Sequence, residues 1–112
     1  MNVRLIIPTQ FLCQNINGCV HETDVTHYLR LVASIAGGYT SYRGHGGWID
    51  SKGLLVEEPI TIVDCFVADS LTINGNNHVV RAFWELARTI AQELSQECVF
   101  LSIDGKAELV RP

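Results

Sequence analysis

Hydrophobic and polar positions alternate with two different periods in the first third of the chain. Residues 3–7, "VRLII", are β-branched and aliphatic, which is typical of a short strand. Between residues 25 and 36 the apolar positions recur every three or four residues, and this spacing predicts an amphipathic helix. Thr23 or Asp24 is the expected N-cap of that helix, and Gly37-Gly38 the expected stop.

The pattern of the remaining residues indicates mostly strands. "YTSYR" (39–43) and "WID" (48–50) are predicted as strand pieces on either side of a glycine-rich bend, with "SKG" (51–53) as a tight turn. Residues 54–69 predict a long strand in which Pro59 marks an edge, a bulge or a bend. A second helix is expected from about residue 77 to 95, followed by strands at 98–103 and, after a "DGK" turn, at 107–111.

This order of elements predicts one ferredoxin-like α+β domain over residues 1–112. The expected unit is βαββαβ, an antiparallel sheet with both helices on one face and a short tail strand. A chain of 112 residues is long enough to bury a single core without disulfide or metal support.

The strand that contains Asp64 is apolar on both faces, with Asp64 as its central ionisable group. A two-layer sheet normally has one apolar face and one polar face. The chain is 47% hydrophobic and only 18% charged, which also indicates more apolar surface than one core can hide. We therefore expect a homodimer that stacks sheet to sheet.

Charge and cysteine content narrow the class of function. The net charge is −4 and the sequence holds no cluster of Lys and Arg, so a nucleic-acid partner is not expected. No segment reaches the ~18 apolar residues of a membrane span. The first residues lack the pattern of a signal peptide, and a cytoplasmic protein without a membrane partner is expected.

Two cysteines are expected in the core and two in a polar loop. Cys65 and Cys98 lie in apolar runs and are interpreted as reduced core residues. Cys13, Cys19 and His21 leave a zinc site, a local disulfide and plain cysteines as alternatives. Their spacing matches no common zinc arrangement, so we predict no metal and no cofactor.

The stretch "GGYTSYRGHGGWIDSKGLLVEEPITIV" resembles a loose group of small bacterial and phage proteins. Its motifs are Gly37-Gly38-Tyr39-Thr40, Gly47-Trp48 and Glu58-Pro59, followed by "QECVFL" after the second helix. The order is also related to that of DUF3574-type proteins, which are similar to dimeric α/β barrels. The resemblance covers roughly residues 25–103. It implies the fold and dimerisation, and it implies no particular activity.

The aromatic and basic residues near the glycines form the main candidate binding site: Tyr39, Tyr42, Arg43, His45 and Trp48. Aromatic rings beside an Arg and a titratable His are suited to a planar or anionic ligand, or to a protein partner. In the alternative interpretation, Tyr39 and Trp48 pack at the sheet edge while Arg43 and His45 are solvated.

Carboxylates offer a second hypothesis. Glu58 and Asp64 share strand parity, and an Asp buried among apolar neighbours would have a raised pKa suited to proton transfer. Alternatively, Asp64 hydrogen-bonds a Tyr or backbone groups at the dimer interface.

The sequence therefore predicts a small homodimeric binding or accessory protein, carried by a phage or mobile element, that acts on a protein partner or a small ligand. The alternative is a cofactor-independent enzyme with a cavity on the sheet face. Asp64, His45 and Tyr42 would be its acid–base groups. A structural or assembly component is the third class.

Overall fold

The computed structural model describes residues 1–8, 22–68 and 77–112 of the chain, which form five strands and two helices. The elements are β1 (Asn2–Pro8), α1 (Glu22–Ala36), β2 (Thr40–Ile49), β3 (Leu55–Phe66), α2 (Asn77–Glu93), β4 (Val99–Ile103) and β5 (Lys106–Val110). The strands make one sheet in the order β2-β3-β1-β4-β5, with every neighbouring pair antiparallel. The predicted α+β class is confirmed.

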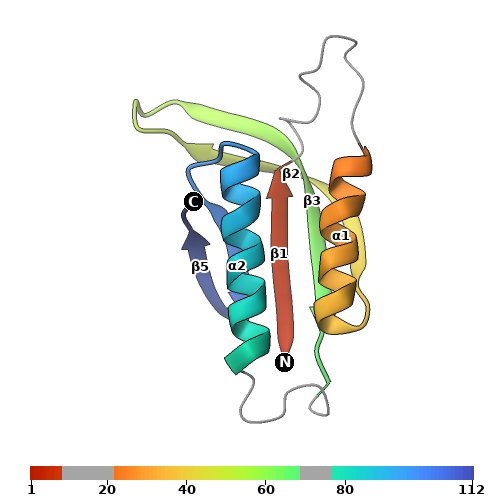
Figure 1. Ribbon diagram of the computed structural model, residues 1–112. Helices are drawn as coiled ribbons and strands as arrows, with labels where there is room; N and C mark the ends of the chain where they lie inside the picture. The colour runs from red at the N-terminus through yellow and green to blue at the C-terminus, as the bar shows by residue number, and fades with distance from the viewer. Residues whose placement is uncertain (9–21, 69–76) are drawn as a thin grey trace.

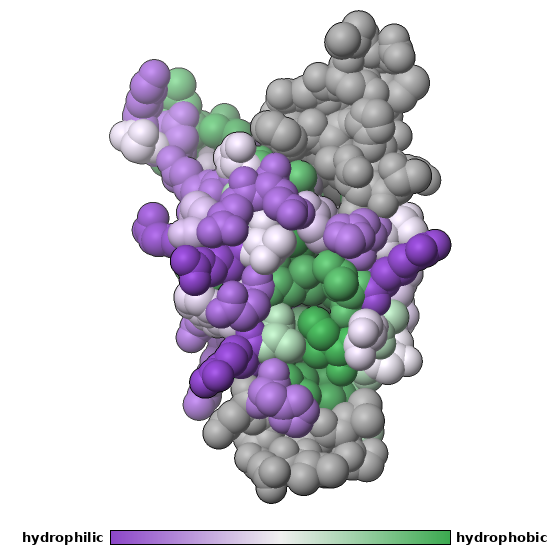
Figure 2. All heavy atoms as spheres, viewed as in Figure 1, coloured by the Kyte–Doolittle hydropathy of each residue, from purple (hydrophilic) through white to green (hydrophobic). Residues whose placement is uncertain are grey.

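Both helices cover the same face of the sheet, and the core lies between them and β1, the middle strand (Figure 1). Val3, Leu5 and Ile7 of β1 point into this core and are at most 3% exposed. From the helices, Phe83 and Ile90 are fully buried against them. Figure 2 shows the resulting division: polar residues gather on the outward side of α2, and an apolar strip lies between the two helices.

Side-chain hydrogen bonds tie the helices to each other and to the sheet. The Tyr28 hydroxyl of α1 donates to Glu93 of α2 at 2.7 Å. The Trp84 indole N–H of α2 donates to Glu108 of β5 at 2.9 Å. Neither of the two described helices covers the other face of the sheet, and we call that face the open face. Its side chains come from alternate positions of the strands, among them Arg4, Tyr42, Trp48, Glu58, Ile60, Ile62, Asp64, Phe66 and Leu109.

The two helices occur where the apolar spacing predicts them, with a correction at one end. Gly37 ends α1 with a φ of 88°, and its amide donates to the Ala33 carbonyl at 2.8 Å. The predicted glycine stop is confirmed. The predicted N-cap is wrong, because α1 begins at Glu22 and Thr23 and Asp24 lie inside it.

The two strand pieces predicted around the glycine-rich stretch belong to one strand, because β2 runs through it without a break, and Figure 1 shows β2 curving along its length. A Cβ on Gly44 would lie 3.0 Å from Ile62 Cδ1, and one on Gly46 would lie 3.3 Å from Ile60 Cγ2. The glycines therefore let two isoleucines of β3 lie over the backbone of β2. Glycine here serves close packing between β2 and β3.

Pro59 likewise does not interrupt β3, which continues across it from Leu55 to Phe66. The last pair between β1 and β3 is Pro8 with Ile60, so Pro59 lies just beyond the point where this neighbour ends. A missing N–H donor is tolerated where a strand has lost a partner. The edge alternative for Pro59 is the one that fits.

The prediction of two reduced core cysteines is confirmed for one of them. Cys65 is buried with a free thiol, and burial raises its pKa to about 11. Cys98 is also free, but it is half-buried and lies outside the core. Cys13, Cys19 and His21 lie outside the described residues. Neither α1 nor α2 has the length and apolar composition needed to cross a membrane.

We expect neighbouring glycines at the end of α1 to differ sharply in their tolerance of alanine. Gly37→Ala places a Cβ at positive φ and should lower the free energy of unfolding by about 1 kcal/mol. Gly38 is not at positive φ and has open space around it, so Gly38→Ala should leave stability nearly unchanged. Urea denaturation of both variants checks this, and equal losses would contradict the C-cap assignment.

Candidate functional site on the open face

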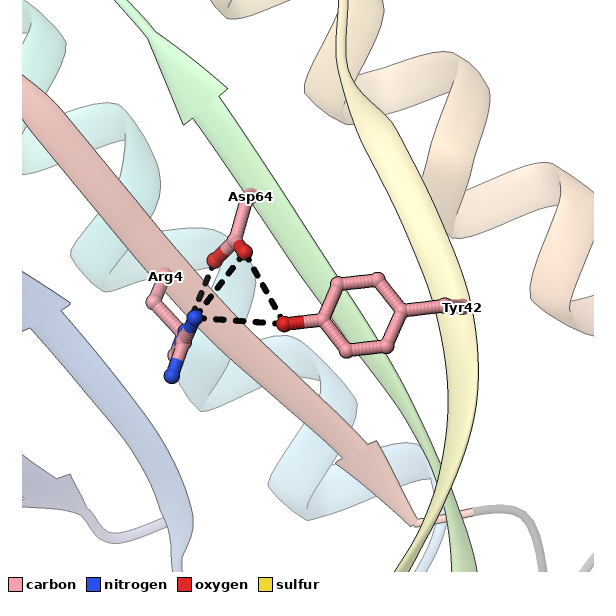
Figure 3. Close-up of polar contacts among 3 residues, drawn as sticks. All are labelled: Arg4, Tyr42 and Asp64. Carbon is pink, nitrogen blue, oxygen red and sulfur yellow. Dashed lines mark hydrogen bonds and ion pairs between the residues drawn. The ribbon is translucent and has the colours of Figure 1, made fainter.

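Three polar side chains meet on the open face, one from each of three adjacent strands (Figure 3). Arg4 of β1 donates to Asp64 of β3 through Nε at 2.7 Å to Oδ1 and through Nη2 at 3.0 Å to Oδ2. The Tyr42 hydroxyl of β2 donates to Asp64 Oδ2 at 3.1 Å, and Arg4 Nη2 also lies 3.2 Å from this hydroxyl. We call these three residues the open-face triad.

Strand register explains why these residues meet. Arg4 is directly opposite Asp64 in the β1–β3 ladder, and Thr40 is opposite Asp64 in the β2–β3 ladder. Tyr42 is two residues beyond Thr40, on the same side of the sheet, within reach of Asp64 on the diagonal. The triad therefore follows from pairing between segments that are far apart in the sequence.

The contact with Arg4 favours the ionised form of the Asp64 carboxyl. The hydrogen bonds and the nearby positive charge of Arg4 hold the pKa of Asp64 below its ordinary value, and Tyr42 adds to the effect. Asp64 in turn raises the pKa of Arg4. The expectation of a raised pKa at Asp64 is wrong, because the side chain is partly exposed and paired. The alternative, that Asp64 hydrogen-bonds a Tyr, is confirmed by the Tyr42 contact.

A hollow of about 470 Å³ opens beside the triad on the open face. Arg4 and Asp64 line it together with Phe66, and Thr40 of β2 and Ser102 of β4 line it from the two flanking strands. Its remaining lining residues are Asn2, Val3, Cys65 and Gly105. The hollow thus combines an ion pair, two hydroxyls and an aromatic ring, and its volume is in the range of small-molecule sites.

The basic members of the sequence-predicted cluster lie on the opposite side of the sheet from Tyr42. Arg43 and His45 occupy the odd positions of the continuous strand β2, which face the helix side. His45 Nε2 lies 3.3 Å from Glu57 Oε1, and both side chains are well exposed. His45 is therefore separated from Asp64 and Tyr42, so the three do not form one acid–base group.

The other two aromatic residues of the predicted cluster are Tyr39 and Trp48, and neither belongs to the open-face triad. Tyr39 precedes β2 and Trp48 lies near its end, opposite Val56, and each is about 40% exposed. Trp48 shares the open face with Tyr42. The structure thus brings Tyr42 and Trp48 to one face and places Arg43 and His45 on the other.

Glu58 is a second carboxylate on the open face, in a very different environment. It is 6% exposed, and burial raises its pKa above the ordinary value. Glu58 and Asp64 share a face as predicted, since β3 is continuous. They lie six residues apart, however, or about 20 Å at the rise of a strand, so one small ligand cannot join both carboxylates directly.

Arg4 is the member of the triad that the sequence analysis missed. Its signal was a single charge within the apolar run "VRLII", at a position whose neighbours Val3 and Leu5 point into the core. The alternation of side chains along β1 is enough to place Arg4 on the open face. Its partner is fixed by the register with β3, which one sequence does not reveal.

No group of three or more His, Cys, Asp or Glu side chains is placed to hold a metal ion within residues 1–8, 22–68 and 77–112. The donor set around the hollow is instead suited to hydrogen bonding with an organic ligand.

Comparison with known proteins identifies similar folds. No family model and no curated protein matches the chain. Among solved structures, a phage SAM lyase in complex with S-methyl-5'-thioadenosine aligns with a TM-score of 0.71 and 13% identity, over 99% of this chain and 88% of that one. The apo state of a phage SAM lyase aligns with a TM-score of 0.66 and 14% identity over the same shares. This chain therefore shares its fold with these phage proteins along nearly its whole length.

We expect the carboxyl of Asp64 to titrate below its ordinary range, and Arg4→Gln to move its pKa upward. A folded-state pKa below the unfolded value stabilises the fold above the unfolded pKa, and that stabilisation is lost as the pH falls through the folded pKa. Carboxyl-carbon NMR between pH 7 and pH 2 measures this directly. Arg30→Gln, on exposed α1, is the control. An unchanged Asp64 titration in Arg4→Gln would contradict the assigned cause.

Proposed function

We propose that this protein binds S-adenosylmethionine (SAM) on its open face and cleaves it, releasing S-methyl-5'-thioadenosine. The observation that carries the proposal is the full-length likeness to a phage SAM lyase in complex with that nucleoside. Because the likeness spans 99% of this chain, the same framework of strands is available in both proteins. The enzyme alternative of the sequence analysis becomes the leading hypothesis.

The chemistry of the ligand fits the groups on the open face. S-methyl-5'-thioadenosine is what remains of SAM when the bond from sulfur to the four-carbon amino-acid chain breaks and sulfur keeps the electron pair. The carbon that loses sulfur gains an electron pair in turn, either from an adjacent C–H bond whose proton leaves to a base or from an oxygen of the substrate's own carboxylate, so the four-carbon fragment leaves as an alkene or a lactone. SAM carries a sulfonium cation, a planar adenine and several hydroxyls. The hollow presents a carboxylate that stays ionised at Asp64, an exposed ring at Phe66 and two hydroxyls. Carboxylates and aromatic faces both favour a nearby cation.

The two open-face carboxyls have different roles in this proposal. Asp64 keeps its charge and its hydrogen bonds to Arg4, so it binds and orients the ligand. Glu58 is buried with a raised pKa, but it lies outside the hollow and about 20 Å from Asp64 along β3. Glu58 therefore does not contact a ligand held at Asp64.

Cleavage of SAM would account for the accessory role that the sequence predicts. A small phage- or mobile-element-encoded enzyme that consumes SAM would act in the cytoplasm of its host, where it would lower the supply of a methyl donor. The neighbouring folds are phage proteins, which supports such an origin.

Incubation of the purified protein with SAM should yield S-methyl-5'-thioadenosine, measured by liquid chromatography. Asp64→Asn should lower the rate about 100-fold or more, because it removes the charge that orients the cationic substrate. Glu58→Gln is the matched control, because Glu58 is a carboxyl on the same strand and the same face but lies outside the hollow. No nucleoside product from the wild-type protein would refute the proposal.

We also propose that the six elements from β1 to β4 form a ferredoxin-like unit and that copies of it pair as a homodimer through the open face. Support comes from large apolar side chains that the helices do not cover: Phe66 is 65% exposed and Leu109 is 64% exposed. Trp48 and Tyr42 add aromatic surface to the same face. Pairing there would bury these side chains and exclude water from the hollow.

A charge introduced on the open face should disrupt this pairing. Leu109→Asp alters β5 at a position outside the hollow, and we expect it to shift the protein from dimer to monomer in light scattering coupled to gel filtration. Leu31→Asp on α1 is the control, since Leu31 is also partly exposed but lies on the helix side. A monomeric wild-type protein would rule out the homodimer.

A further inference from the structure

An aromatic ring and a carboxamide lie next to each other at one end of the open face. Phe66 of β3 is directly opposite Asn2 of β1 in the antiparallel ladder, and both residues line the hollow. Side chains of directly opposed residues stand on the same face of a sheet, with their Cβ atoms about 5 Å apart. We call these two residues the ring–amide pair.

Phe66 offers a ring surface that the packing of the fold does not use. It is 65% exposed, more than any other aromatic residue that the structure describes. Phe66 is the last residue of β3, and Gly105, which lines the same hollow, adds no side chain. The preceding residue on this face of β3 is Asp64, about 7 Å away along the strand. One nucleoside in the hollow can therefore contact both the ring and the carboxylate.

Asn2 combines a fixed backbone with an unused side chain. Its amide donates to Asp104 Oδ1 at 2.8 Å, and its carbonyl accepts from the Asp104 amide at 2.8 Å. Within residues 1–8, 22–68 and 77–112, no group hydrogen-bonds the Asn2 carboxamide, and the residue is exposed. A carboxamide has an acceptor oxygen and two N–H donors, so it can accept from and donate to the same edge of a ligand.

We propose that the ring–amide pair is the adenine subsite of the hollow. The base stacks on Phe66, while the Asn2 carboxamide accepts from the 6-amino group of adenine and donates to N7. Asparagine makes this two-bond contact with adenine when proteins read DNA. The proposal rests on the proposed function, because adenine is the planar part of both SAM and S-methyl-5'-thioadenosine. It extends that function by assigning the end of the hollow that the base occupies.

The two members of the pair contribute differently to recognition. A ring stacks on any nucleobase, because every base has a π-face, so Phe66 supplies affinity without choosing the base. The carboxamide distinguishes adenine from hypoxanthine, which has a carbonyl in place of the 6-amino group. Hypoxanthine presents two acceptors at this edge, and the carboxamide oxygen would then lie against one of them. The pair thus predicts a specific preference for adenine.

Isothermal titration with S-methyl-5'-thioadenosine and with its hypoxanthine analogue, S-methyl-5'-thioinosine, tests the subsite. The wild-type protein should prefer the adenine compound. Asn2→Ala should weaken binding of the adenine compound about 5- to 100-fold and leave the inosine compound nearly unchanged, so the preference disappears. Phe66→Leu should weaken both compounds by a similar factor of about 5- to 100-fold, since stacking does not depend on the base.

Phe100→Leu is the matched control for the ring. Phe100 is opposite Leu109 on the open face but lies outside the hollow, so this variant should bind both compounds as the wild-type protein does. Phe66→Leu also keeps an apolar side chain on the open face, which separates stacking from apolar burial. Equal loss of both compounds in Asn2→Ala, no loss in Phe66→Leu, or no binding to the wild-type protein would overturn the assignment.

Binding and cleavage give separate results, because neither nucleoside contains the sulfonium bond that the proposed reaction breaks. Adenine-specific binding that depends on Asn2, without any cleavage of SAM, would refute the proposed function and leave the subsite standing. Cleavage of SAM by the wild-type protein, with unchanged binding of both nucleosides to Asn2→Ala, would refute the subsite alone.

Discussion

The two-residue period of β1 is the constraint on which both the core and the candidate site depend. β1 is the middle strand, hydrogen-bonded to β3 on one side and β4 on the other. Its odd positions, Val3, Leu5 and Ile7, are buried against the helices, so Arg4 must point to the open face. A shift of one residue in register would bury the guanidinium and expose the core. The packing that stabilises the fold therefore also fixes the position of Arg4.

Local signals in the sequence are sufficient to predict the types of the elements. Helix periodicity and a glycine stop identify α1, and β-branched or apolar runs bounded by turn residues identify the strands, because each signal depends on neighbours within a few residues. The packing role of the glycines in β2 was missed for a nonlocal reason. Gly44 and Gly46 accommodate Ile60 and Ile62 of β3, and nothing within β2 itself indicates this contact.

The candidate site was only partly predictable because it depends on pairing between distant segments. Asp64 and Tyr42 were identified from residue type, but their partner Arg4 is sixty residues from Asp64 in the chain. The expected cluster of Tyr42, Arg43 and His45 does not form, because β2 stays paired with β3 throughout and a continuous strand sends consecutive side chains to opposite faces. The burial of Glu58 likewise appears only in three dimensions.

The position of β2 at the margin of the sheet has a consequence for how the triad moves. Arg4 and Asp64 belong to inner strands, each paired on both sides, whereas β2 is an edge strand that pairs with β3 alone among the five described strands. Outer strands open more readily in native-state fluctuations, and their amides exchange with solvent sooner. Fraying of β2 would withdraw the Tyr42 hydroxyl while the ion pair stays in place. Arg4 and Asp64 would keep their positions while Tyr42 moves away from them. The hollow would then widen on the β2 side without unfolding of the core.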